Sequence, residues 1–489
     1  MLLKIILVLF STKKNRFLSF SVLGILIFLV SNQNGMFWDN VLFASKMGNQ
    51  LYYNSIFDWT MPDAFDPGHP PFLGFLLTVS WKLLGHHLWV SHLVILPFTI
   101  GFFYQLFRFI SCFIDTIQLQ FLAFLLIIID PTISTAFVLV NPEIIIIFFF
   151  FLAVNGILFK SKTQKLIGLL FLSIVTFRSM MLFGGIFLFE ICNNLLLEKK
   201  KIKSVLNIKF LSLYILGSLP GVLFVIWRLS TKGWLQTHPN SPWASYWHFV
   251  DFEFFIRNSI VLIWRYVDFG RIFIFLFLLI SIFLFGKKII QSEKNKKLLL
   301  LAISSVFFIV VTVLIATNAF GHRYFIVSYI AFFLLAFRVL QEFYIKKRII
   351  YLLLCIGLLT GNLWVYPKNI SQGWNATLGH LPYHSLRLEA VDYLNKNNIS
   401  IEEVASFFPN YNILDYIDFK GDKRSFPEFD GTNKYVFYAS VYNLTDEEQK
   451  TLANHYSVLK QFHKFNTTIK IFILNNYDSI RRKSNIKSN

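Results

Sequence analysis

Apolar runs of about 20 residues recur along this chain, and short clusters of Lys and Arg separate them. A run of that length crosses a bilayer as a helix, because a helix satisfies its own backbone hydrogen bonds where no water is present. Hydrophobic residues make up 55% of the 489 residues, 58 residues are Phe, and only 15% are charged. No soluble domain buries so much apolar surface, so the sequence predicts a polytopic α-helical membrane protein.

The formal net charge of +19 is also found in proteins that bind nucleic acids. In this chain the basic residues lie in short loops between the apolar runs, where membrane topology explains them, and we expect no nucleic-acid partner. The three cysteines, Cys112, Cys192 and Cys355, each lie in an apolar segment. They have no metal-ligand spacing, and we expect no structural disulfide.

The basic loops predict the orientation of the helices, because Lys and Arg in short loops mark the cytoplasmic side. A basic cluster at 13–16 precedes the run FLSFSVLGILIFLV, which has no small-residue cleavage site and is interpreted as a retained first span. The other basic loops lie at 160–165, 198–209, 287–297 and 346–348, with a weaker one at Arg108. Every one of these loops falls on the cytoplasmic side if the chain has spans at 89–107, 117–138 and 143–159, hairpins at 166–197, 210–286 and 298–345, and a last span at 349–366. The sequence therefore predicts about eleven spans, with the N-terminus inside and the C-terminus outside.

Three turns are expected on the outer side. The hairpin 166–197 turns near Arg178, and the hairpin 298–345 turns near 318–324. The hairpin 210–286 contains a long outer loop, 230–268, which is rich in Trp, Tyr and His. Such an aromatic loop is either a wall for a sugar or a part of the interfacial aromatic belt.

Residues 38–88 contain the stretch FDPGHPPFLGFL at 65–76, in which prolines and ionisable residues directly precede an apolar run. Proline stops a helix that enters from its N-terminal side, but it is tolerated in the first turn of a new helix. Treating 69–84 as a span would put Arg108 outside and Lys160 on the wrong side of the membrane unless another span is added. We therefore expect 38–88 to be a large outer loop, with a helix over 70–84 that lies along the membrane surface.

The composition changes after Pro367, where a small α/β domain on the outer face is predicted over 367–489. A helix is expected over 384–398, and strands are expected at VASFF, at KYVFYASVY and at TTIKIFILNN. The segment TDEEQKTLANHYSVLKQF begins with Thr and has Glu three positions later, a pattern that predicts a capped helix.

Ionisable residues in a membrane protein of this kind are candidates for function. Here they gather at the expected outer ends of the spans, and the candidates are Asp39, Asp66, His69, Asp130, Glu143, Arg178, His322, Arg323 and Tyr324. Each also has a structural interpretation. Asp39 can be a solvated helix end, Asp130 before Pro131 can cap a helix, and Glu143 suits a helix N-terminus. The arginines can reach lipid headgroups.

The order of these residues resembles that of a known family. An acid follows span one in MFWDN, an HPP segment opens an interfacial helix, NPE opens a later span, and HRY opens a late one. This order is similar to that of the GT-C glycosyltransferases: protein O-mannosyltransferases, lipid A aminoarabinose transferases and their bacterial relatives. HPPFLGFLLTVSWKLLG is the most specific match, and the tail WNATLGHLPYHSLRLEAVDYL also resembles a bacterial member. Two positions depart from the pattern: Glu143 stands where Asp is common, and Arg178 stands near a common Lys.

The resemblance implies a GT-C-like fold and an enzyme that takes a sugar from a polyprenyl phosphate on the outer face of the membrane. It implies Asp39 as the general base toward the acceptor, with inversion of the anomeric carbon. Glu143 would orient the acceptor or support Asp39. The leaving phosphate would meet Arg178 and Arg323, because the guanidinium fork binds two oxygens. His69 and Tyr324 would add hydrogen bonds.

The expected partners follow from the same resemblance. Low-GC residue usage indicates a bacterium, so the carrier would be undecaprenyl phosphate, and the acceptor would be a lipid, a glycan or a protein. We expect a multi-pass protein of the bacterial inner membrane with an extracytoplasmic C-terminal domain. No cofactor is expected, and a divalent cation between Asp39 and Glu143 has no support in the spacing of ligands.

Three other functions compete with this one. A transporter or lipid flippase predicts charges at mid-membrane and broken helices in corresponding halves, whereas the acids here gather at one surface. A polysaccharide polymerase or ligase would place its large outer loop late in the chain, and here the charged loop follows span one. A non-enzymatic anchor for the tail domain leaves the polar cluster unexplained.

Overall fold

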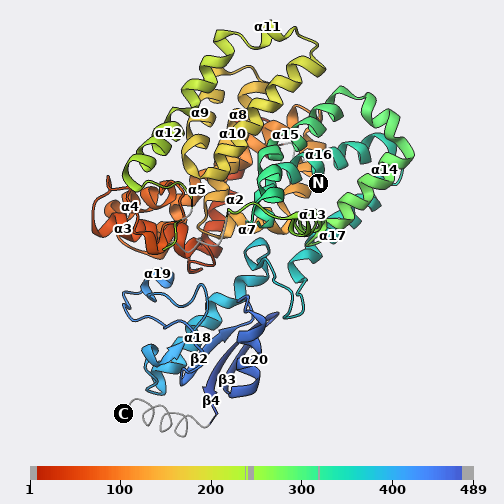
Figure 1. Ribbon diagram of the computed structural model, residues 1–489. Coiled ribbons are helices and arrows are strands. Elements are labelled where there is room, and N and C mark those ends of the chain that lie inside the picture. Colours follow the sequence, from red (N-terminus) through yellow and green to blue (C-terminus); the bar gives the residue numbers. More distant parts are fainter. Residues whose placement is uncertain (1–7, 237, 241–246, 318–319, 476–489) are drawn as a thin grey trace.

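A computed structural model describes residues 8–236, 238–240, 247–317 and 320–475 of the chain. Helices form one large body, and a small α/β unit made by the C-terminal part lies against one end of it (Figure 1). Helix α11 (Ile202–Val205), in the basic segment 198–209, lies at the opposite end of the helical body (Figure 1). The basic segment and the C-terminal unit are therefore separated by the whole length of the helices.

Seven helical segments in the described residues are long and apolar enough to cross a membrane. They are α2 (Lys13–Ser31), α5 (Leu88–Ser111), α10 (Phe177–Cys192) with η3 (Asn193–Leu197), α12 (Ile208–Lys232), α14 (Ile272–Gln291), α15 (Glu293–Ile315), and η4 (His322–Phe325) with α16 (Ile326–Phe343). Helix α8 (Pro142–Leu158) is apolar but shorter, and α9 (Lys162–Val175) and α17 (Lys347–Thr360) have 14 residues each. The multi-helix membrane architecture is thus confirmed, while the number of eleven crossings stays a prediction.

The expected third span, 117–138, is wrong as a single helix. It consists of α6 (Ile117–Ile128) and α7 (Pro131–Val138), which are bent by 79° relative to each other. Proline disfavours the helical conformation in the residue before it, and Asp130 accordingly has an extended ψ of 131°. Its carboxylate accepts hydrogen bonds from the Thr132 and Ile133 N–H groups and so caps α7. This is the structural role that the sequence allowed for Asp130.

The outer segment 38–88 folds into η1 (Val41–Lys46, a π-helical turn), α3 (Met47–Tyr53), η2 (Asp63–Phe65) and α4 (Phe72–Leu84). Helix α4 starts directly after the proline pair, which confirms the helix predicted over 70–84. The outer loop 230–268 is not all loop: it contains α13 (Phe252–Val267), a helix that the aromatic composition did not suggest. Residues 237 and 241–246 of that loop, and 318–319 of the predicted turn at 318–324, lie outside the described residues.

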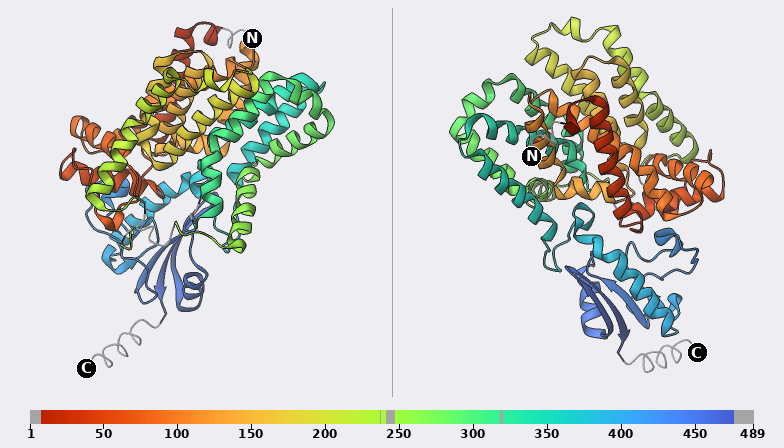
Figure 2. Two further views of the ribbon diagram at one scale, coloured as in Figure 1. Left: turned by 45° about the horizontal axis from the view of Figure 1, so that its top comes forward. Right: turned by 180° about the vertical axis from the view of Figure 1, so that it is seen from behind.

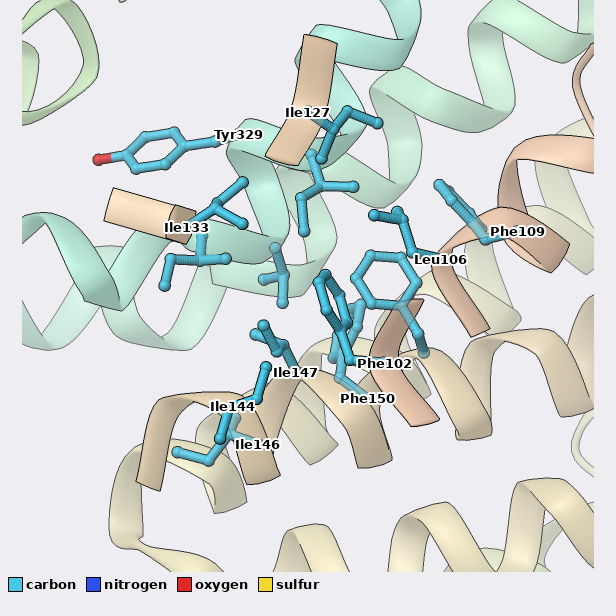
Figure 3. Packing of buried hydrophobic residues seen from close by; sticks show 14 of the residues in the cluster. Phe102, Leu106, Phe109, Ile127, Ile133, Ile144, Ile146, Ile147, Phe150 and Tyr329 are labelled. Atoms are coloured by element: carbon cyan, nitrogen blue, oxygen red, sulfur yellow. The ribbon is translucent and has the colours of Figure 1, made fainter. Parts of the chain in front are cut away.

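The apolar core of the helical body joins segments from both halves of the chain. Figure 3 shows Phe102 and Leu106 of α5 near Phe150 and Ile147 of α8. The side chains of Phe102, Leu106 and Phe150 are fully buried. Phe and Ile fill this interior closely, so the polar ends of the helices are held on a rigid support.

The C-terminal unit has one mixed sheet of four strands in the order β1-β2-β4-β3. The strands are β1 (Val404–Ala405), β2 (Tyr435–Ala439), β3 (Tyr456–Lys464) and β4 (Thr467–Leu474); β1 and β2 are parallel and the other pairs antiparallel. Helices α18 (Leu381–Lys396) and α20 (Asp446–His455) accompany the sheet, and a four-residue helix, α19 (Asp415–Asp418), precedes β2 (Figure 2).

One prediction for this unit is half wrong. The capping box of Thr445 and Glu448 is present at α20, but the helix ends at His455, and the rest of the predicted segment forms β3. The sequence YSVLKQF contains aromatic and β-branched residues, and pairing with β4 stabilises it as a strand. The capping box therefore determines where α20 begins but not how far it extends.

Backbone and side-chain hydrogen bonds join the C-terminal unit to the helical body. Met36 N–H donates to the Ile417 carbonyl at 2.8 Å, and the Thr132 hydroxyl donates to the Ala376 carbonyl at 3.2 Å. The ring of Phe37 stacks on the ring of His380, with 4.7 Å between the centroids. The contacts of Met36 and Phe37 lie two to three residues before Asp39, so the C-terminal unit helps to fix the start of the outer segment.

Candidate active site

Asp39 lies at the turn that connects the first span to η1. Its carbonyl accepts the Leu42 and Phe43 N–H groups, which begins the helical turn. The preceding residue, Trp38, has a φ of 57°, a left-handed conformation that is costly for a residue with a side chain. Trp38 packs against Phe37 and Phe408, and this aromatic packing holds the strained turn in place.

Arg323, which is 284 residues away in the sequence, forms an ion pair with the Asp39 carboxylate. The Nε atom of Arg323 is also 3.4 Å from Oε1 of Glu143, in the first turn of α8. The Asp39 and Arg323 side chains are about 15% exposed, whereas Glu143 is only 4% exposed. One guanidinium group therefore connects an acid at the surface with an acid beneath it.

Arg178 approaches the same Glu143 from another helix. Its Nη2 atom donates to Glu143 Oε1 at 2.5 Å, and its guanidinium lies 4.5 Å from the centroid of the Tyr324 ring. Arg178 is the second residue of α10, whose N-terminus is fixed by a reciprocal capping box between Thr176 and Ser179. The one-residue break at Thr176 between α9 and α10 forms the tight turn that was predicted near Arg178.

His69 adds a neutral polar group to this cluster. Its Nδ1 atom accepts a hydrogen bond from the Phe177 N–H at 3.5 Å. Burial, assisted by the Arg178, Arg228 and Arg323 guanidinium groups, lowers the pKa of His69 to about 3. A neutral imidazole that accepts at Nδ1 carries its proton on Nε2, so His69 can donate one hydrogen bond to a ligand.

Glu143, Arg178 and Arg323 line a small pocket whose opposite wall is apolar. The pocket is bounded by Glu143, Ile146, Ile147, Arg178, Leu182, Arg323, Tyr324, Ile326 and Val327. Two guanidinium groups thus face a space that is otherwise formed by aliphatic side chains from α8, α10 and α16. Glu143 Oε2 is buried and has no hydrogen-bond partner in the described part of the chain. The cavity is only about 10 Å³, room for roughly one water molecule, so a ligand with an anionic head and a hydrocarbon tail would enter only after the lining side chains move.

The structure does not place Asp66 in that pocket but in a neighbouring ion pair. Its carboxylate lies 3.1 Å from Nη2 of Arg228 in α12, and both side chains are almost fully buried. It also accepts the Gly68 N–H at 2.8 Å, and Gly68 has a φ of 80° that favours glycine. This Asp66–Arg228 pair anchors the DPGH turn on α12 and so positions His69.

Asp130 and His322 are likewise held by partners that sequence reasoning did not identify. Asp130 lies 3.0 Å from Arg271, and both side chains are fully buried. His322 Nε2 lies 2.7 Å from the carboxylate of Asp268, which also accepts the hydroxyl of Tyr366. His322 is the first residue of η4, so this contact with Asp268 fixes the turn that carries Arg323.

The signal for the missed cations was present in the sequence. Arg228 lies within the apolar run of α12, and a charged residue inside such a run requires a buried partner or a function. The partner itself was not visible, because Asp66 and Arg228 come together only through the packing of the outer loop on α12. The described part of loop 230–268 packs near the same place, with the Trp234 ring 4.3 Å from the Arg228 guanidinium.

No group of three or more His, Cys, Asp and Glu side chains with the geometry of a metal site exists within the residues that the structure describes. The six residues that the structure brings together are Asp39, His69, Glu143, Arg178, Arg323 and Tyr324. Chemically, this cluster offers carboxylates that can accept a proton and cations that can hold a phosphate.

A scan against models of known protein families finds no match for this chain, and a search of curated proteins finds none either. Two solved structures are similar to it, both of ArnT, a lipid A aminoarabinose transferase, from Cupriavidus metallidurans. The structure bound to undecaprenyl phosphate has a TM-score of 0.52 at 10% identity, and the apo structure has a TM-score of 0.50 at 11% identity. Each similarity covers 93% of this chain and 97% of the ArnT chain. The chain therefore shares its overall fold with ArnT.

Proposed function

We propose that this protein is a membrane glycosyltransferase that moves a sugar from an undecaprenyl-phosphate donor to an acceptor on the outer face of the inner membrane. The observation that supports the proposal is the ion-paired cluster of Asp39, Glu143, Arg178 and Arg323, of which the last three line a small and largely apolar pocket. The similarity of the fold to an ArnT structure that binds undecaprenyl phosphate supports the choice of carrier.

The reaction requires one proton acceptor and one stabilised leaving group. The oxygen of an acceptor hydroxyl attacks the anomeric carbon, and its proton passes to the Asp39 carboxylate. The bond between the anomeric carbon and the phosphate oxygen breaks, and undecaprenyl phosphate leaves with that electron pair. A single displacement of this kind inverts the anomeric carbon.

The two arginines have the role of neutralising the leaving phosphate. Preorganised cations stabilise charge that develops in the transition state, and a guanidinium fork can hold two phosphate oxygens. Without donor, Glu143 and Asp39 hold the two arginines in place. When the phosphate binds, Arg323 turns from Asp39 to the phosphate, and the Asp39 carboxylate is then free to accept a proton.

The remaining residues of the pocket receive the rest of the donor. Ile146, Ile147 and Leu182 provide an apolar surface for the polyprenyl tail. His69 donates from Nε2 to a phosphate oxygen, and Tyr324 orders Arg178 through its ring. Glu143 Oε2, which is buried without a partner in the described residues, accepts a hydroxyl of the donor sugar or of the acceptor.

The experiment that tests this function is sugar transfer by the Asp39→Asn variant in membranes supplied with undecaprenyl-phosphate sugars. A general base contributes about 100-fold to 10,000-fold, so we expect transfer to fall by at least that lower factor. Asn retains the shape of the side chain and removes the proton acceptor. Expression and thermal stability in detergent should stay close to those of the wild type.

Asp58→Asn is the matched control, because Asp58 is an exposed acid of the same outer segment whose side chain accepts the Thr60 N–H. Its transfer rate should equal that of the wild type. Wild-type turnover by Asp39→Asn would remove Asp39 from the mechanism.

A further inference from the structure

A second pocket lies between the outer segment and the C-terminal unit. Its volume is about 400 Å³, which lies within the range of small-molecule sites, roughly 300–1,000 Å³. One wall comes from η1 and α3 and includes Lys46, Asn49 and Tyr53. The other wall comes from residues 411–426 of the C-terminal unit and includes Tyr411 and Tyr416. We call this space the outer pocket.

The walls of the outer pocket combine aromatic rings with amide groups. Three tyrosine rings and the amides of Asn49 and Asn412 face it. Rings with an apolar face and a polar edge suit ligands that are themselves amphipathic. Sugars have this character, since their C–H faces pack on rings while their hydroxyl groups exchange hydrogen bonds with amides.

Asn49 provides an unused acceptor at the wall of the outer pocket. Its side chain is 1% exposed, and its Nδ2 atom donates to the carbonyl and the hydroxyl of Ser45. Its Oδ1 atom is buried and has no hydrogen-bond partner within the described ranges. Buried polar atoms are rarely left unpaired, and this oxygen would gain a hydroxyl donor from a ligand if the Asn49 side chain turned toward the outer pocket.

Lys46 adds an uncompensated positive charge to the same wall. Its ammonium lies 5.9 Å from the centroid of the Phe65 ring, and the described part of the chain provides no carboxylate within 4.0 Å of it. Burial lowers the pKa of Lys46, which reflects the lack of a partner. The neighbouring Lys423, by contrast, is paired with Asp415 at 2.7 Å. An anionic group of a ligand would supply the partner that Lys46 lacks.

We propose that the outer pocket binds a saccharide that carries an acidic group, and that this saccharide is the acceptor end of the transfer reaction. The second half of this statement rests on the proposed function. Lys46 and Asn49 belong to one continuous helical segment, η1 and α3, which begins directly after Asp39. At about 1.5 Å per residue, Asn49 lies roughly 15 Å from Asp39 along that segment, a distance that a short oligosaccharide spans.

The test measures the binding of defined trisaccharides to the full-length protein in detergent, without donor. The probes are trigalacturonate, its fully methyl-esterified and uncharged form, and an otherwise uncharged trisaccharide bearing one phosphate. We expect saturable binding of at least one acidic probe, at least tenfold tighter than that of the ester. The carboxylate and phosphate probes distinguish the two sources of the negative charge.

Lys46→Gln should weaken the binding of the acidic probe at least fivefold and leave the ester unchanged. Lys82→Gln is the matched control, since Lys82 is exposed on the neighbouring α4, outside the outer pocket, and should have no effect. Tyr411→Ala should weaken both probes, while Tyr411→Phe should retain most of the affinity. A melting curve of each variant shows that the fold is intact.

Absence of saturable binding by both acidic probes would overturn the proposal, as would a loss of less than fivefold in Lys46→Gln. The binding measurement uses no donor and no transfer step, so it is independent of the Asp39→Asn assay. Full transfer by Asp39→Asn would refute the proposed function while leaving the binding result intact. Unchanged binding by Lys46→Gln would refute the outer pocket while leaving the Asp39 test intact.

Discussion

Glu143 is the residue on which both arginines of the candidate site depend. One of its oxygens contacts Arg178 and Arg323 together, and its own position is fixed at the first turn of α8, where Asn141 caps the helix. A carboxylate at a helix N-terminus is favourable in any protein. Here the same carboxylate also aligns two cations from later parts of the chain, so the structural and the functional interpretation of Glu143 are compatible.

His69 should make the stability of the protein depend on pH. Its pKa is about 3 in the folded protein and about 6.5 in the unfolded chain. As pH falls from 7 to 5, only the unfolded chain takes up this proton, so stability is lost as the pH falls. In His69→Asn, whose amide oxygen can still accept the Phe177 N–H, the loss between pH 7 and pH 5 should be smaller by about 2 kcal/mol.

Thermal unfolding in detergent at pH 7 and pH 5 measures this difference. His87→Asn, at an exposed position a few residues beyond α4, is the control and should reproduce the wild-type loss. An equal acid sensitivity of His69→Asn and the wild type would mean that His69 is not buried in its neutral form.

The residues of the candidate site could be named from the sequence because each departs from its surroundings in type. Asp39, Glu143 and Arg323 are charged residues at the ends of apolar runs. Their partners could not be named, because pairs such as Asp39 and Arg323 depend on how helices far apart in the chain pack. Asp268, Arg271 and Tyr366 were missed for the same reason, since each acquires its role only from a distant partner.

At the scale of elements, the interruption between α6 and α7 shows what local sequence determines. Asp130 and Pro131 end one helix and start another. Pro131 alone predicts this bend, because proline interrupts a helix even within a continuous apolar run. The sequence did not predict helix α13, because its apolar residues are mixed with charged ones. The aromatic residues of the segment 230–268 instead indicated a loop. Conversely, the capping box at Thr445 predicts a helix, but that helix ends at His455, because the residues that follow pair with β4 and form β3.

Asp130→Asn should destabilise the protein although it keeps the helix cap. Asn is as good a cap as Asp, so α7 should still start at Pro131. The buried Arg271 would lose its counter-charge, and breaking a buried pair from one side costs about 3–5 kcal/mol. The midpoint of thermal unfolding in detergent should fall accordingly.

The double variant Asp130→Asn/Arg271→Met provides the control for that prediction. It removes both charges and should recover a large part of the lost stability, since the unpaired guanidinium is gone. A double variant less stable than Asp130→Asn alone would show that Arg271 is needed for another reason, such as its contact with the Tyr329 ring.

At the scale of the whole molecule, the fold places the basic segment 198–209 and the α/β unit at opposite ends (Figure 1). The positive-inside rule predicted this separation from the sequence, because it depends only on the order of apolar runs and basic loops. The candidate site and the outer pocket both lie toward the end that carries the C-terminal unit, and the basic segment with α11 lies at the other (Figure 1). Under the proposed function, donor and acceptor would meet at the end that carries the C-terminal unit.

Cysteine labelling tests this orientation in whole cells. In a variant whose three native cysteines are replaced, Lys396→Cys in α18 should react with a membrane-impermeant maleimide, because Lys396 is 73% exposed in the C-terminal unit. Lys162→Cys, exposed at the start of α9, should react only after the cells are opened. Labelling of position 162 but not of position 396 in intact cells would show that the topology is the reverse of the one predicted.

The central claim is that Arg178 and Arg323 hold the phosphate of a lipid carrier beside Asp39. A density map of the full-length protein with bound undecaprenyl phosphate tests it most directly. We expect phosphate oxygens about 2.7–3.2 Å from the nitrogen atoms of both guanidinium groups, with Arg323 released from Asp39 and the tail along Ile146 and Leu182. A phosphate bound elsewhere, with the pair of Asp39 and Arg323 still intact, would contradict it.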